Sequence, residues 1–242
     1  MQTSVIIPAY NESGSIGKVI DAIDRTIVRK VIVVDNGSDD GTGEVAGNHG
    51  AVVVRENKRG YGYACLAGIL AAGDCDIIVF LDGDYSDYPD EIQKVILPLV
   101  QGDADLVIGS RVLGGAEKGS LTIPQRFGNF LAVSLLNWIF HTAYTDLGPF
   151  RAIRKKALDQ LAMKDKKYGW TVEMQIKAAF QNMKIAEVPV SYRKRYAGRS
   201  KVSGNVKGVF LAGSYILYYV FQAFFLTLIG RRKKTAAAPG EV

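Results

Sequence analysis

Two carboxylates separated by one glycine follow an apolar run in the first half of the chain, in Asp82-Gly83-Asp84. The run, residues 76–81, is too short for a helix and rich in β-branched residues, so it predicts a buried strand. If the strand continues through Asp84, the two carboxylates share a side, because alternate residues of a strand point the same way. Two carboxylates with phosphate oxygens and water suit Mg²⁺ or Mn²⁺. An acidic turn is the simpler explanation of so short a motif, so the rest of the chain must decide.

The strand before this motif is one of five that alternate with helices. Apolar runs predict strands at residues 3–7, 31–34, 51–54, 76–81 and 104–109, and the clearest helices between them at 15–26, from 57–62 through 72, and 89–100. This alternation predicts an α/β fold with a mostly parallel sheet covered by helices on both faces. Ligands of such sheets bind beyond the carboxyl ends of the strands. Five polar loops follow these ends, after Ile7, Val34, Val54, Leu81 and Ile108.

The side chains in these loops form a set that suits a nucleoside diphosphate. Glu12 and Asp35 are placed to take a nucleobase or ribose, and Lys58 and Arg111 to meet phosphate. The carboxylate pair after the fourth strand would hold a metal that bridges the diphosphate. Each residue alone is equally explained as a helix cap, a turn residue or surface charge. The set at one sheet edge favours nucleotide binding.

Composition supports anionic partners. The 242 residues are 48% hydrophobic and 22% charged, which is typical of a globular protein. The net charge of +6 suits nucleotides, phosphates or an acidic membrane surface. Nucleic acid is not expected, since no nucleic-acid-binding motif accompanies the charge. Cys65 and Cys75 are too few and too badly spaced for a disulfide framework or a zinc site.

The second half of the chain departs from the alternation. An apolar helix is predicted at about 127–142, a structured loop at 145–151, a helix after residues 168–174 and an edge strand at 185–192. Residues 193–201 are dense in Arg and Lys, which suits either a phosphate-binding loop or a solvated surface.

The last apolar segment is a predicted membrane-associated helix. Residues 208–230 contain no charged side chain and are followed by a basic run at 231–234. The length suffices to span a bilayer, but Ser214, Tyr218 and Gln222 form a polar stripe that favours a helix lying in the interface. The basic end is expected at an anionic cytoplasmic surface. We therefore predict a catalytic domain at 1–205, a membrane-associated helix at 206–230 and a basic, disordered tail at 231–242.

Four motifs together resemble glycosyltransferase family 2: residues 5–12 (VIIPAYNE), residues 33–42 (VVDNGSDDGT), Asp82-Gly83-Asp84 and Gly109-Ser110-Arg111. The resemblance implies the GT-A fold of nucleotide-sugar transferases, which is Rossmann-like. Two later segments, Phe150-Arg151-Ala152 and residues 195–201, are similar to the dolichyl-phosphate mannose or glucose synthase type.

The resemblance also implies roles for individual residues. The nucleotide sugar would be bound by Pro8, Tyr10, Glu12, Asp35, Gly37, Lys58, Asp82 and Arg111. The metal, Mg²⁺ or Mn²⁺, would be held by Asp82 and Asp84. The acceptor phosphate would be met by Arg126, Arg199, Ser200 and Lys201. Where relatives often carry glutamine this chain has Ser86, so Asp87 becomes a candidate third metal ligand. Gly148-Pro149 also replaces the Ser-Gly common in relatives, on the acceptor side.

The implied activity is transfer of a hexose, with inversion, from a UDP- or GDP-sugar to a polyprenyl phosphate at the cytoplasmic face of a membrane. Asp84 and Arg111 would act in catalysis. A phosphate acceptor is already mostly dianionic at neutral pH and requires no protein base. A hydroxyl acceptor on a saccharide or glycolipid would require one, and Glu173, ahead of the predicted second-half helix, is the candidate. Its simpler role is a helix-end charge or a hydrogen bond to the loop.

A third hypothesis is a nucleotide-binding or membrane-scaffolding protein without catalysis. The coexistence of Asp82 and Asp84 with Arg111 argues against it, because a scaffold has no use for metal and phosphate sites together.

Overall fold

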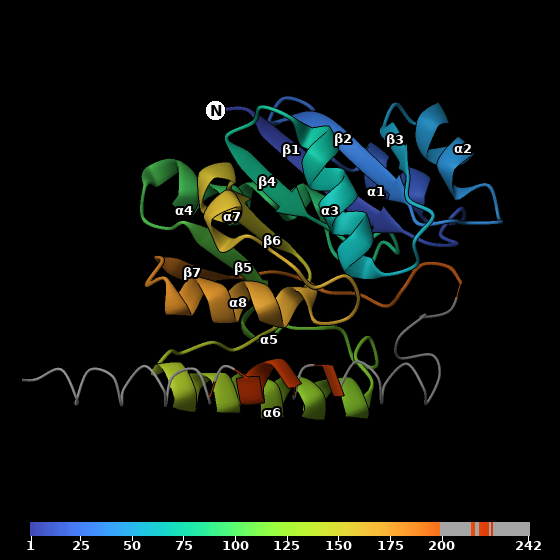
Figure 1. Ribbon diagram of the computed structural model, residues 1–242. Helices are drawn as coiled ribbons and strands as arrows, with labels where there is room; N and C mark the ends of the chain where they lie inside the picture. The colour runs from blue at the N-terminus through green and yellow to red at the C-terminus, as the bar shows by residue number, and fades with distance from the viewer. Residues whose placement is uncertain (199–213, 216–217, 223, 225–242) are drawn as a thin grey trace, which may run out of the picture.

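The computed structural model describes residues 1–198, 214–215, 218–222 and 224. Within these residues, seven strands form one sheet in the order β3-β2-β1-β4-β6-β5-β7 (Figure 1). The strands are β1 Thr3–Ala9, β2 Val28–Asp35, β3 Val52–Arg55, β4 Ile77–Phe80, β5 Leu106–Ser110, β6 Arg151–Arg154 and β7 Ile185–Pro189.

Helices follow most of the strands. They are α1 Ile16–Asp21, α2 Thr42–Asn48, α3 Tyr61–Ala72, α4 Ile92–Gln101 after a 3₁₀ turn at Pro89–Glu91, α5 Arg111–Gly114, α6 Ile123–Phe140, α7 Lys155–Leu161 and α8 Trp170–Phe180. The fold is therefore α/β with a mostly parallel sheet, as the alternating pattern predicts.

The carboxyl ends of β1 to β5 lie at one edge of the sheet, as predicted. β1 pairs in parallel with β2 and β4, and β2 pairs in parallel with β3. β5 and β4 both pair antiparallel with β6, so they run in the same direction as each other. The five polar loops therefore meet at the carboxyl ends of these strands. β7 is the outermost strand on one side of the sheet, as its proline suggests.

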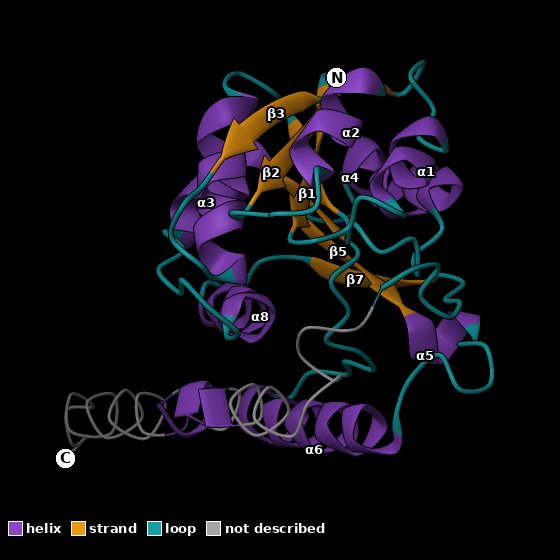
Figure 2. Ribbon diagram, turned by 90° about the vertical axis from the view of Figure 1, so that its right-hand side faces the viewer, coloured by secondary structure: helices purple, strands orange, loops and turns teal. Residues whose placement is uncertain are grey.

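Alternate side chains of the strands point to opposite faces of the sheet, and each face has its own hydrophobic core. Val5 and Ile7 face α1, α2 and α4, whereas Ile6 packs with α3 and α8. Figure 2 shows the sheet with α1, α2 and α4 on one side and with α3 and α8 on the other. Burial of both faces explains why the central strands β1 and β4 carry apolar side chains on both sides.

Two elements lie where the sequence predicts none. The predicted loop at 145–151 ends in β6, the antiparallel strand, and the basic residues after it form α7. β6 is only four residues long and carries Arg at both ends, so it lacks the apolar run that reveals a strand. β6 fills the space between β4 and β5, which otherwise would be neighbours.

The helix α6 lies on the far side of α8 from the sheet (Figure 1), and its buried side belongs to the same core as α3 and α8. It begins four residues earlier than predicted, at a capping box in which Thr122 and Gln125 bond each other's backbone. One side of α6 packs towards α8 through Val133 and Leu136.

The predicted membrane-associated helix at 206–230 and the tail at 231–242 lie largely outside the described residues. The described residues between 214 and 224 are helical and lie beside α6, where the rings of Trp138 and Phe224 stack at 5.6 Å. Val220 is buried, whereas Ser214, Tyr218 and Gln222 are exposed. Within the described part of the chain, no helix combines the length and the apolar character that crossing a bilayer requires.

Candidate active site

The carboxylates of Asp82 and Asp84 are positioned by a turn and not by a continued strand. β4 ends at Phe80, and Tyr85 takes a left-handed conformation with φ of 62°. Asp82 accepts a hydrogen bond from the Tyr61 hydroxyl at 3.2 Å. One oxygen of Asp84 accepts the Ser86 N–H at 2.9 Å, and the other pairs with the Arg195 guanidinium at 3.0 Å. The strand therefore does not continue through Asp84, the condition under which the two carboxylates would share a side, but they remain neighbours.

Negative charge is concentrated at this turn. Burial and the adjacent charge of Asp84 raise the pKa of Asp82 to about 7. Asp87 is buried, and both of its carboxylate oxygens lack a hydrogen-bond partner. Burial, followed by the charges of Asp82 and Asp84, raises the pKa of Asp87 well above its usual range. Such a concentration of carboxylates suits a divalent cation.

The described residues do not form a metal cage of three protein side chains from His, Cys, Asp or Glu. Asp87 bridges Tyr192 through its backbone, and its role as a third metal ligand stays a prediction. Asp82 and Asp84 remain the pair that fits a metal, with phosphate and water oxygens as the other ligands.

The loops after β1 and β2 are joined to each other. The Asn11 side chain donates to Asp39 at 2.7 Å, and the Glu12 N–H donates to the Thr42 hydroxyl at 2.8 Å. Asp35, at the end of β2, is buried and accepts the Ser38 N–H at 2.8 Å. These bonds fix the two loops as one wall of the site.

Tyr10 carries a stacked arginine that the sequence analysis did not single out. The Arg59 guanidinium lies 3.6 Å from the centroid of the Tyr10 ring. Gly37 has φ of 76° and lies beside Arg59, where a Cβ would be 3.4 Å from Nε. Lys58 is exposed, and its Nζ lies 5.8 Å from the Tyr63 ring centroid. Of Lys58 and Arg59, Arg59 is therefore the one whose side chain contacts Tyr10. Pro8 lies within β1, where it pairs with Val34 of β2.

Arg111 is held by a buried network. Its guanidinium makes two hydrogen bonds to Asp146, at 2.8 and 2.7 Å, and its backbone N–H makes a third at 2.9 Å. The attraction of Asp146 outweighs the effect of burial and raises the pKa of Arg111. Glu187 of β7 in turn accepts hydrogen bonds from Thr145 and from the Asp146 N–H. Arg111 is thus fixed at this end of the sheet through its Nε, one Nη2 hydrogen and its backbone N–H.

The predicted acceptor residues are only partly described. Arg126 lies exposed in the first turn of α6. Arg199, Ser200 and Lys201 lie outside the described residues. α6 is linked to the site, because Asn129 donates to the Thr145 carbonyl at 3.1 Å and accepts the Leu147 N–H at 2.9 Å. These two residues flank Asp146, the partner of Arg111.

Glu173 lies in the first turn of α8, not ahead of the helix as predicted. It is buried, accepts the N–H groups of Lys164 and Asp165 and pairs with Lys177 at 2.7 Å. Asp165 also accepts the Tyr219 hydroxyl at 3.1 Å, which joins this loop to the C-terminal helical residues. These contacts are those of the simpler role that the sequence allowed, a carboxylate that orders the loop.

Arg195 was missed as a partner of the carboxylates. The sequence marked it only as one of several basic residues in a loop, since nothing local predicts an ion pair with Glu12 or Asp84. Asp146 and Glu187 gave an equally weak signal, as single acidic residues in apolar surroundings.

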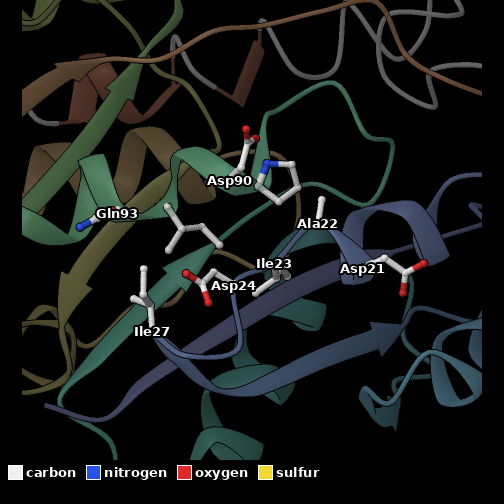
Figure 3. Close-up of a pocket in the computed structure, with 9 residues that line it drawn as sticks. Asp21, Ala22, Ile23, Asp24, Ile27, Asp90 and Gln93 are labelled. Carbon is white, nitrogen blue, oxygen red and sulfur yellow. The ribbon is translucent and has the colours of Figure 1, made fainter.

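A pocket of about 230 Å³ lies elsewhere, between the end of α1 and the start of α4 (Figure 3). Its lining includes Asp21, Asp24 and Asp90 but no basic side chain. Three carboxylates without a cation disfavour a phosphate-bearing ligand, so this pocket is not a candidate donor site.

Residues 4–162 match the model of Glycosyl transferase family 2. This stretch contains the turn of Asp82 and Asp84, the loops after β1 and β2 and the network of Arg111. The chain belongs to glycosyl transferase family 2. The resemblance drawn from the motifs is thereby confirmed, and this family 2 protein is a glycosyltransferase rather than a scaffold.

Two relatives and one solved structure are similar to this family 2 protein over most of its length. It is 34% identical over 217 residues to a dolichyl-phosphate hexose transferase of Haloferax volcanii, covering 88% of this chain and 92% of the relative. It is 32% identical over 225 residues to an undecaprenyl-phosphate mannosyltransferase of Micrococcus luteus, covering 86% of this chain and 90% of the relative.

The solved structure is glucosyl-3-phosphoglycerate synthase from Mycobacterium tuberculosis in complex with Mn²⁺, UDP and phosphoglyceric acid. It superposes with a TM-score of 0.74 at 23% identity, over 92% of this chain and 78% of that one. At this identity the likeness shows the fold, which is GT-A-like.

Proposed function

We propose that this protein transfers a hexose from a UDP- or GDP-sugar to a polyprenyl phosphate, by a single in-line displacement that inverts the anomeric carbon. The two relatives are named as transferases of dolichyl phosphate and undecaprenyl phosphate, and these names support this acceptor class. The observation on this chain that carries the proposal is the exposed apolar side of α6.

The donor would lie over the edge formed by β1, β2 and β4. Tyr10, Glu12 and Asp35 would face the base and ribose, with Pro8 and Gly37 shaping the floor and Lys58 nearby. Asp82 and Asp84 would hold Mg²⁺ or Mn²⁺, which would supply positive charge to the departing diphosphate. Arg111 would add to that charge. A similarly folded synthase was solved in complex with Mn²⁺ and UDP, which supports a metal and a nucleotide as ligands.

The exposed apolar side of α6 is formed by Ile123, Phe127, Phe130 and Trp138, hereafter the α6 apolar face. These side chains are between 65% and 83% exposed. Their spacing of four, three and eight residues places them on one side of the helix. Several large apolar side chains exposed on one side of a helix favour an interaction surface, and aromatic rings are enriched at membrane interfaces.

The α6 apolar face adjoins phosphate-binding side chains. Arg126 lies in the same helix, one residue before Phe127. Asn129 ties the helix to the loop that carries Asp146, the partner of Arg111. A ligand with a phosphate head and an apolar tail would therefore find both halves of its site along α6. Arg199, Ser200 and Lys201 are proposed to add further contacts to the acceptor phosphate.

A phosphate acceptor also agrees with the state of Glu173. With two backbone N–H groups and Lys177 as partners, its carboxylate is engaged in folding contacts. Removing a proton from a saccharide hydroxyl would require a carboxylate directed at the acceptor. A phosphate monoester, with a second pKa near 6, needs no such base. The hydroxyl-acceptor alternative thus has less support than the lipid phosphate.

The proposed location is the cytoplasmic face of a membrane, with α6 and the C-terminal helix lying in the interface. The basic run at 231–234 supports this orientation, because anionic lipids attract such segments.

The deciding experiment is a radiolabel transfer assay. Purified protein is offered UDP- and GDP-hexoses with Mg²⁺ or Mn²⁺ and, separately, a short polyprenyl phosphate, phosphoglyceric acid and a saccharide acceptor. Label is expected in the lipid extract, and Asp84→Asn is expected to remove it. Label that moves only to phosphoglyceric acid would replace the lipid acceptor with a small soluble phosphate. Label that moves only to the saccharide would support the alternative with Glu173 as base.

A further inference from the structure

A short segment crosses the candidate site from the edge strand β7. Residues 191–198, hereafter the strap, follow β7 and run over the turn that carries Asp84. The Arg193 N–H donates to the Ser86 carbonyl at 2.9 Å, and the Tyr196 N–H donates to the Asp84 carbonyl at 3.2 Å. The Arg193 guanidinium stacks on the rings of Tyr85 and Tyr88 at 3.5 and 4.1 Å. The strap is thus fastened to the turn by its backbone and by Arg193, independently of any ion pair.

Arg195 of the strap binds two carboxylates at once. Its Nη1 lies 2.7 Å from both oxygens of Glu12, and its Nη2 lies 3.0 Å from Oδ2 of Asp84. Glu12 is 8% exposed and the Arg195 side chain 21%, so water screens these contacts only weakly. Although burial opposes it, the attraction of Asp84 and Glu12 raises the pKa of Arg195.

The contact at Asp84 uses the oxygen that does not accept the Ser86 N–H. Oδ1 already accepts the Ser86 N–H, and Oδ2 faces the guanidinium. A divalent cation approaching Oδ2 meets a fixed positive charge at hydrogen-bond distance from the same atom. Like charges at such a separation repel strongly where water is scarce. The cation and Arg195 therefore cannot both hold Oδ2 in this geometry.

We propose that Arg195 and the divalent metal compete for Asp84, which makes Arg195 a positioning residue that sets the metal affinity of the donor-free site. Without metal, Arg195 neutralises Asp84 and holds it beside Glu12. When a metal displaces Arg195 from Asp84, the guanidinium loses a negatively charged partner. A nucleoside diphosphate that binds together with the metal supplies a new one. Metal and nucleotide therefore bind cooperatively, by the reciprocity that links any two coupled ligands. The inference rests on the proposed role of Asp84 as a metal ligand.

The test measures binding of Mn²⁺ alone to the whole protein, from the paramagnetic resonance signal of free Mn²⁺. Arg195→Gln is expected to bind Mn²⁺ at least about threefold more tightly than the wild type, because the competing charge is gone. Arg195→Lys, which keeps the charge, is expected to stay within about twofold of the wild type. Adding UDP or GDP is expected to tighten Mn²⁺ binding by a larger factor in the wild type than in Arg195→Gln.

Lys194→Gln is the matched control, since Lys194 is an exposed cation on the same strap with its backbone N–H on Glu117, and it is expected to leave Mn²⁺ binding unchanged. Glu12→Gln is a second variant that keeps Arg195 and leaves Asp84 as its only carboxylate partner, so it is expected to weaken Mn²⁺ binding. This variant remains informative if Arg195→Gln fails to fold, which a thermal unfolding curve would reveal.

Two outcomes overturn the inference in distinguishable ways. Unchanged or weaker Mn²⁺ binding in Arg195→Gln, with binding lost in Asp84→Asn, would mean that Arg195 orders the metal site without competing for it. Unchanged Mn²⁺ binding in Asp84→Asn would remove the proposed metal role of Asp84, and the competition with it.

Discussion

The loops around Asp84 bury charged side chains, whereas the α6 apolar face exposes apolar ones. At the loops, charged side chains are buried and paired within the protein, as in Arg195 with Glu12 and Arg111 with Asp146. On α6, large apolar side chains such as Phe127 and Phe130 stand in water with no covering element among the described residues.

The difference shows what each region requires of its ligand. At the loops, a ligand has to exchange one ionic partner for another, because an unpaired buried charge is costly. At α6, a ligand has only to cover apolar surface, which is favourable without any exchange. The loops are therefore expected to determine which ligand binds, and α6 is expected to provide less selective attachment to an apolar surface. Four variants sharpen or break this contrast.

The largest effect is expected from Asp84→Asn. Loss of one ionic metal ligand should lower transfer by about 100-fold or more, the size seen when a preorganised electrostatic group is removed from an active site. Hexose transfer at saturating donor measures it, and Asp90→Asn, an exposed aspartate in the 3₁₀ turn after this loop, serves as the control. Activity within threefold of the wild type in Asp84→Asn would mean that Asp84 takes no part in the reaction.

Asp146→Asn should chiefly reduce stability. Asp146 is 1% exposed and makes three hydrogen bonds to Arg111, so the change leaves a largely buried guanidinium without its counter-charge. Breaking such a pair typically costs about 3–5 kcal/mol. Urea unfolding followed by circular dichroism measures the loss. A free energy of unfolding within 1 kcal/mol of the wild type, roughly the worth of an exposed pair, would contradict the structural importance of this network.

The double substitution Phe127→Ser and Phe130→Ser should weaken binding to anionic liposomes by at least about tenfold, since burying one such side chain contributes about 1.5–3 kcal/mol when complete. Both rings are exposed, so the free energy of unfolding should change little. Flotation with vesicles measures the binding. Leu70→Ser on α3, where Leu70 is 83% exposed, is the matched control, and an equal loss in that variant would remove α6 as the membrane-facing helix.

The smallest effect on transfer is expected from Glu173→Gln. The amide oxygen can still accept a backbone N–H, but the pair with Lys177 is lost, so stability should fall by about 1–3 kcal/mol. Transfer to polyprenyl phosphate should remain within about tenfold of the wild type, because a dianionic phosphate needs no base. A loss of several orders of magnitude, at a temperature where the variant is folded, would instead make Glu173 a catalytic base.

Much of the fold follows from local pattern. The strands β1, β2, β4 and β5 each contain an apolar run, and their polar ends are visible as abrupt changes of composition. Parallel pairing then brings those ends to one edge, without further information from the sequence. The wall of Glu12, Asp35 and the Asp84 turn could therefore be predicted.

Short and charged segments could not be predicted in this way. β6 has four residues, two of them Arg, and becomes a strand only because β4 and β5 leave a place for it. Arg151 at its start is fully buried, and its guanidinium is held by backbone carbonyls of Gly148 and Thr171. Nothing in a run of basic residues indicates which one the fold encloses.

The sequence by itself determined the family, the alternating architecture and the residue types gathered at the sheet edge, because each depends on neighbours along the chain. The tertiary structure decided which charges pair. Arg195 and Glu12 lie 183 residues apart, and Glu173 meets Lys164 and Asp165 only where α8 packs back on its preceding loop. An ion pair depends on distance in space, which a sequence pattern does not contain. For that reason the partners of Arg195 and Glu173 emerged only from the folded chain.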